Sequence, residues 1–165
     1  MRTYLHAFIA ALLLLGPSLG AAEVPNFSGS YTLTAAKGDF EFSKDTAWTL
    51  SVIQTGAAIE VTRVMDGRAS VNRFPLDGAE GGYTSPTGVP GKCKGQLKGK
   101  NLILESVVVT HPARNRPGFD TRTRERWELS ANSKTLTIRN DVDYPGSSLE
   151  GLHVVQPWTE IYTRN

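Results

Sequence analysis

Cysteine is almost absent from this sequence, since Cys93 is the only one among 165 residues. A single cysteine excludes an intrachain disulfide, so the fold cannot depend on covalent cross-links. Histidine is nearly as scarce, and neither His111 nor His153 has a second His, a Cys or a carboxylate at metal-ligand spacing. The sequence therefore predicts no metal site and no catalytic histidine, and we expect Cys93 to be a buried, unreactive thiol.

Long apolar runs are missing after the first residues of the chain. The run at 7–15 follows Arg2 and precedes the small residues Gly20, Ala21 and Ala22, a pattern typical of a secretory signal peptide. It is too short to span a bilayer, so we expect no transmembrane segment in the mature chain. We expect residues 1–22 to be removed, residues 23–165 to form one domain, and the protein to be exported, either to the periplasm or by secretion.

Neither sign of charge is in large excess. The chain has 18 Lys and Arg against 16 Asp and Glu, and loss of Arg2 leaves 17 against 16. A net charge of +1 gives no strong attraction to nucleic acid or to an anionic membrane, so we expect neither as a partner. Arg122, Arg124 and Arg126 alternate along one segment, but no aromatic residue that could stack a base shares their face, which favours a solvated outer surface.

Helical periodicity is also missing after residue 23, whereas short alternating segments rich in Thr, Val, Ile and aromatic residues recur between turn residues. They predict nine strands, at 28–35, 48–55, 59–65, 69–76, 92–97, 102–110, 121–130, 135–144 and 154–163. We predict an all-β fold without substantial helix, a single antiparallel up-and-down barrel of about eight to nine strands. Two longer segments, Asp77 to Gly91 and Thr110 to Asp120, are predicted to be loops without regular structure.

The tight turn at 131–134 predicts how two strands pair. It places Trp127 opposite Ile138, and this apolar pair defines the inner face of the sheet. Glu125 and Asn140 then lie side by side on the same inner face. The other face pairs Arg122 with Asp143 and Arg124 with Asp141. Opposite charges at both outer pairs support this register.

Two further turns place polar residues inside the barrel in the same way. The turn at 55–58 puts Arg63 on the face that carries Trp48 and Met65, which would bring a guanidinium into the interior. The turn at 98–101 places Cys93 opposite Ser106 on the apolar side, in agreement with a buried thiol.

A sequence signature supports the barrel. Phe27-x-Gly29-x-Tyr31 resembles the F-x-G-x-W signature that opens lipocalins and related calycin barrels, with Tyr31 in place of Trp. The chain also carries NFSGSY at 26–31, ERWELS at 125–130 and KTLTI at 134–138, which resemble segments of exported, mostly uncharacterised bacterial lipocalin-like proteins. The resemblance implies that Tyr31 plugs the closed end of the barrel and that Arg164 covers it.

The interior residues suggest a binding site. A barrel of about eight strands holds either side chains or one small ligand, and an ionic group inside must be paired, hydrated or bound to a ligand. Our leading hypothesis is a monomeric carrier or sensor for a small, partly apolar or amphiphilic molecule, needing no cofactor. Its candidate ligand-binding residues are Arg63, which would anchor a carboxylate, with Glu125, Asn140, Trp48, Trp127 and Met65. Alternatively, Arg63 and Glu125 form only an internal ion pair or a polar cluster with Asn140 and Gln54.

Two other functions stay open. The first is an envelope interaction module with a filled barrel that acts through the loops 77–91 and 110–120. The second is an enzyme that uses Glu125 and Arg63 on a substrate inside the barrel. The second is less favoured, because the sequence has no nucleophile elbow, phosphate-binding loop or dinucleotide-binding glycine pattern.

Overall fold

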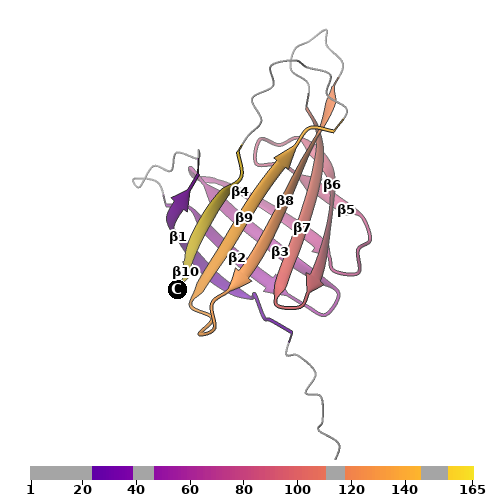
Figure 1. The fold of residues 1–165 in the computed structure, drawn as a ribbon. Coiled ribbons are helices and arrows are strands. Elements are labelled where there is room, and N and C mark those ends of the chain that lie inside the picture. The colour runs from indigo at the N-terminus through magenta and orange to yellow at the C-terminus, as the bar shows by residue number, and fades with distance from the viewer. Residues whose placement is uncertain (1–23, 39–46, 111–117, 146–155) are drawn as a thin grey trace, which may run out of the picture.

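The computed structural model describes residues 24–38, 47–110, 118–145 and 156–165. These residues form ten β-strands and no helix (Figure 1). The strands are β1 (Gly29–Lys37), β2 (Thr49–Gln54), β3 (Ala58–Met65), β4 (Arg68–Pro75), β5 (Gly81–Thr84), β6 (Pro90–Lys98), β7 (Asn101–Thr110), β8 (Phe119–Leu129), β9 (Thr135–Asp143) and β10 (Trp158–Arg164). The expected signal peptide, His111, His153 and most of the loop 110–120 lie outside the described residues.

The ten strands form one antiparallel sheet in the order β4-β3-β2-β1-β10-β9-β8-β7-β6-β5. Strands adjacent in sequence are neighbours in the sheet, except β4 and β5, which lie at its two ends, and the pairing of β1 with β10 joins the first and last strands. In Figure 1, β7 to β10 cross in front of β2 to β4, with the interior between the two walls. The predicted all-β, single antiparallel up-and-down barrel is confirmed, although with ten strands instead of eight or nine.

The additional strand lies inside the segment 77–91, so the prediction of an irregular loop there is wrong. Gly81–Thr84 forms β5 and pairs with β6, with Gly81 opposite Cys93. Gly78 and Gly88 adopt positive φ angles outside the strands, whereas Gly91 lies where another backbone comes close. A Cβ atom on Gly91 would lie only 2.2 Å from the carbonyl oxygen of Val107 on the next strand.

The three predicted registers are confirmed. Glu125 lies opposite Asn140, Leu50 opposite Arg63, and Cys93 opposite Ser106. On the outer face Arg122 pairs with Asp143 at 3.9 Å, whereas Arg124 lies opposite Asp141 but forms its ion pair with Glu105 of β7, at 3.6 Å. The β2–β3 ladder ends at Thr49 opposite Val64, so Trp48 and Met65 lie at its very end.

One end of the barrel is closed by a packed aromatic cluster. Tyr31 is fully buried, and its hydroxyl donates to the carbonyl oxygen of Phe27 at 2.8 Å. The Arg164 guanidinium lies 5.2 Å from the centre of the Tyr31 ring and donates to the Tyr31 hydroxyl at 2.6 Å. A Cβ atom on Gly29 would lie 3.1 Å from Nε of Arg164, so glycine leaves room for this side chain. Phe27 makes an edge-to-face contact with Trp127 at 6.3 Å, which continues the cluster inward.

The two ends of the sheet, β4 and β5, are joined by side chains. The amide of Asn72 donates to the carbonyl oxygen of Thr84 at 3.0 Å and accepts from its backbone N–H at 2.8 Å. The buried Cys93 thiol lies 3.4 Å from the carbonyl oxygen of Arg73 and 3.3 Å from that of Gly82. We call this contact between β4, β5 and β6 the seam. The expected buried thiol is confirmed, and it is part of the seam.

Candidate functional site

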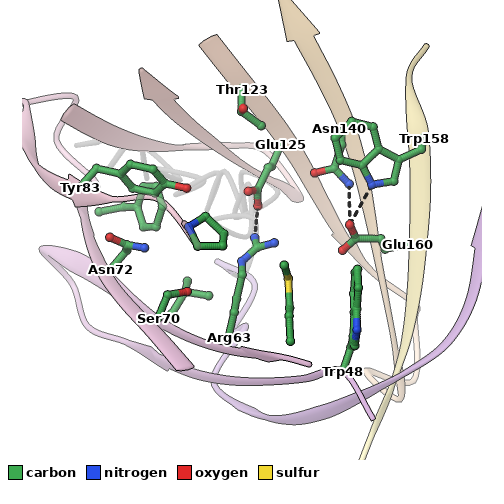
Figure 2. Close-up of a pocket in the computed structure, with 14 residues that line it drawn as sticks. Trp48, Arg63, Ser70, Asn72, Tyr83, Thr123, Glu125, Asn140, Trp158 and Glu160 are labelled. Atoms are coloured by element: carbon green, nitrogen blue, oxygen red, sulfur yellow. Dashed lines mark hydrogen bonds and ion pairs between the residues drawn. The ribbon is translucent and has the colours of Figure 1, made fainter. Parts of the chain in front are cut away.

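The barrel interior is not filled. A cavity of about 180 Å³ lies on the opposite side of Trp127 from the Tyr31 plug. Its lining comes from both walls: Trp48; Val61, Arg63 and Met65 of β3; Ser70, Asn72 and Phe74 of β4; Tyr83 and Pro86; Thr123 and Glu125 of β8; Asn140 of β9; and Trp158 and Glu160 of β10. On each strand these positions are two residues apart, because alternate side chains of a strand face inward. Figure 2 draws these side chains around one space.

Arg63 and Glu125 cross this space and form an ion pair through Nη2 and Oε2 (Figure 2). The indole Nε1 of Trp127 donates to the same carboxylate oxygen at 2.7 Å, and the Arg63 guanidinium lies 5.8 Å from the Trp127 ring centre. Burial is the largest effect on the pKa of Arg63 and lowers it, but the charges of Glu125 and Glu160 outweigh burial and raise this pKa. Arg63 therefore remains a cation inside the barrel.

Glu160 is a second interior carboxylate, which sequence reasoning missed. It is 4% exposed, and its Oε1 accepts from Trp158 Nε1 at 2.9 Å and Asn140 Nδ2 at 3.3 Å (Figure 2). Its Oε2 accepts from the hydroxyl of Tyr162 at 2.8 Å. Burial, and then the charge of Glu160, raise the pKa of Tyr162, so this hydroxyl keeps its proton and donates. The parity of the last strand could have revealed Glu160, because it lies four residues before Arg164 on the same face.

The wall of the cavity formed by β4 and β5 carries aromatic rings. Tyr83 of β5 packs against Phe74 at 6.2 Å, and burial first, then Glu125, raise the pKa of the Tyr83 hydroxyl. Trp48 also lines the cavity, and its Nε1 donates to Asp66 at 3.2 Å. Met65 also lines a neighbouring surface cavity of about 450 Å³ at the β3–β4 turn, so the interior space adjoins the surface there.

Five of the six candidate ligand-binding residues line the cavity: Trp48, Arg63, Met65, Glu125 and Asn140. The sixth, Trp127, is fully buried beneath it. The expected internal ion pair between Arg63 and Glu125 is present, but Gln54 is not near it. Its side chain accepts from the backbone N–H of Phe27 at 2.9 Å instead. A ligand-binding role for these residues stays a prediction.

Within the described ranges, no three His, Cys, Asp or Glu side chains gather closely enough to hold a metal ion. A helix long and apolar enough to cross a membrane is likewise not found in the part of the chain that the structure describes.

Neither a protein-family model nor a curated protein matches this sequence. Solved structures do match its fold. The REP1-NXSQ fatty acid transporter superposes with a TM-score of 0.58 at 12% identity, covering 84% of this chain and 95% of that chain. Fatty-acid-binding protein 1 of Echinococcus granulosus gives 0.57 at 12% identity, covering 84% of this chain and 96% of that one.

The apo form of lipid binding protein 8 from Caenorhabditis elegans gives a TM-score of 0.55 at 9% identity, with 84% of this chain and 95% of that chain covered. The fold is a calycin-type barrel. At such low identity the likeness concerns the fold alone. The interior of this barrel brings one arginine and two carboxylates together around a small cavity.

Proposed function

We propose that this protein is an exported carrier or sensor that binds one small, partly apolar molecule inside its calycin-type barrel. The observation that carries the proposal is the cavity of about 180 Å³, lined by the aromatic rings of Trp48, Phe74 and Trp158 and by several polar side chains. Small-molecule sites likewise combine apolar surface with polar groups at defined positions. An apolar cavity of about 150 Å³ is already large enough to take benzene. The size therefore favours a ligand with a compact body.

Two kinds of observation support this proposal besides the cavity. The similar solved structures are described as a fatty acid transporter, a fatty-acid-binding protein and a lipid binding protein. The apolar run at 7–15 supports export, because it has the length and flanks of a signal peptide. Export is tested by measuring the mass of the protein recovered outside the cytoplasm. This mass should correspond to a chain that begins at Glu23.

The two alternatives receive less support. An interaction module with a filled barrel conflicts with the cavity, which exposes polar groups of Arg63 and Glu125 to its interior. An enzyme acting through Glu125 would need that carboxylate available to a substrate. Instead, Glu125 already accepts from Arg63 and Trp127.

The proposal is tested by thermal shift and native mass spectrometry with a panel of small aromatic and aliphatic amphiphiles. A ligand present at about 100 times its Kd stabilises the folded state by about 2.7 kcal/mol. Thr123→Phe should fill the cavity and abolish this shift, whereas Ser51→Phe, on the exposed face of β2, adds the same ring outside and should retain it. If no compound raises the melting temperature and the purified protein carries no bound mass, the proposal is refuted.

A further inference from the structure

The charges that line the cavity do not balance. Among the 14 described residues that line the cavity, Arg63 is the only one with a basic side chain, and Glu125 and Glu160 are the two with acidic side chains. Glu125 is paired with Arg63. The described part of the lining therefore has one carboxylate more than it has cations.

The carboxylate of Glu160 holds the excess charge. Its three hydrogen-bond donors, from Trp158, Asn140 and Tyr162, are all neutral. Neutral donors satisfy the oxygens of a carboxylate without supplying an opposite charge. A buried charge is costly unless a counter-ion lies close to it. A cationic group placed in the cavity would provide that counter-ion.

The walls beside Glu160 suit a cation with an apolar body. Trp48 and Trp158 both line the same cavity, and in the view of Figure 2 the Glu160 carboxylate lies between them. Indole rings attract ammonium groups through their π-systems, and also provide apolar surface.

An anionic ligand fits this charge arrangement poorly. Arg63, the residue that would anchor a carboxylate, is already engaged by Glu125 and also feels the charge of Glu160. An added anion would be a third carboxylate around one guanidinium. Charges of the same sign repel strongly where water is excluded.

We propose that the cavity takes a small organic cation, an ammonium group on a compact apolar body, with its charge at Glu160 and its body against Trp48 and Trp158. The inference rests on the proposed function and names the class of ligand that this function serves.

The decisive experiment uses ligands that differ in charge and hardly in size. Benzylammonium, benzyl alcohol and benzoate form one set, and hexylammonium, hexanol and hexanoate form a second. Dissociation constants are measured by NMR titration of the natural protein at neutral pH. We expect the ammonium compound of at least one set to bind about tenfold or more tightly than its alcohol, and the carboxylate to bind most weakly.

The outcomes separate the two proposals. If an alcohol or a carboxylate binds as tightly as the ammonium in both sets, a neutral or anionic ligand is indicated, and the inference is overturned while the proposed function stands. Binding of none of the six compounds would count against the proposed function itself, and the inference would fall with it.

A pair of variants locates the charge that is responsible. Glu160→Gln keeps the shape of the side chain and removes the excess charge, so the preference for ammonium over alcohol should fall below about threefold. Glu128→Gln removes the same formal charge from the exposed face of β8 and should leave the preference unchanged. Equal preferences in the two variants would overturn the role of Glu160. The comparison of the six compounds on the natural protein needs no variant, so it decides the class of ligand even if Glu160→Gln folds poorly.

Discussion

Shortening Tyr31 to alanine tests the plug at the closed end of the barrel. The ring is fully buried, and replacing a buried aromatic residue by alanine typically costs about 3–5 kcal/mol. The variant also loses the hydrogen bonds of the hydroxyl to Phe27 and Arg164. Arg164 keeps the carbonyl oxygen of Ser28 as an acceptor at 2.9 Å, so no buried cation is left without a partner. We therefore expect a loss of about 4 kcal/mol in the free energy of unfolding.

The measurement is urea unfolding followed by tryptophan fluorescence, because Trp127 packs against Phe27 next to the plug. A loss of this size lowers the melting temperature of a domain of this length by roughly 12–16 °C. Tyr31→Phe keeps the ring and loses only the hydrogen bonds, so it should cost about 1–3 kcal/mol. Ser30→Ala changes the exposed neighbour on the same strand and should stay within about 0.5 kcal/mol of the natural protein. A cost below about 1 kcal/mol for Tyr31→Ala would refute the assignment of Tyr31 as the plug.

Three further predictions concern the interior and the seam. Arg63→Met leaves Glu125 buried without its cation and should lower the free energy of unfolding, measured in urea, by about 3–5 kcal/mol. Adding Glu125→Gln to the same chain should restore part of this loss, and no recovery in the double variant would contradict a direct pairing. Asn72→Ala removes both hydrogen bonds to Thr84 and should speed amide hydrogen exchange at Thr84 at least tenfold, while unchanged exchange would show that the seam does not depend on them. Burial raises the pKa of the Cys93 thiol, so a thiol reagent should modify Cys93 only after denaturant is added, and rapid modification of the folded protein would disprove its burial.

The sequence predicted which residues face the interior wherever a tight turn joins two strands. The turns at 55–58 and 131–134 placed Arg63 and Glu125 inside, and the structure agrees. This succeeds because side chains alternate with a period of two, so one pair of opposed residues orients two whole strands. No tight turn leads into β10, so its register could not be derived in this way, and Glu160 was missed.

The position of a side chain along the barrel axis could not be predicted from the alternation of side chains along a strand. Trp127 and Glu125 share a face, yet Trp127 belongs to the buried cluster and Glu125 to the cavity. Two residues along a strand correspond to about 7 Å, and which of them meets the cavity depends on the tilt and stagger of all the strands. β5 was missed for a different reason. Gly81 and Gly82 occur in a segment that resembles a flexible loop, and only the structure reveals that they pair with β6.

The pairing of β1 with β10 has a consequence for how the chain folds. All the other strand pairs join segments adjacent in sequence, so each needs a much shorter loop to close than the β1–β10 pair does. The pairing of β1 with β10 closes the barrel and brings Tyr31 and Arg164 together across 133 positions of sequence. It is therefore the most non-local event in folding. Contacts of this kind slow folding, because a large loop must be ordered before they contribute. A nascent chain can therefore form hairpins early, but its barrel stays open, with the aromatic plug uncovered, until β10 has been made.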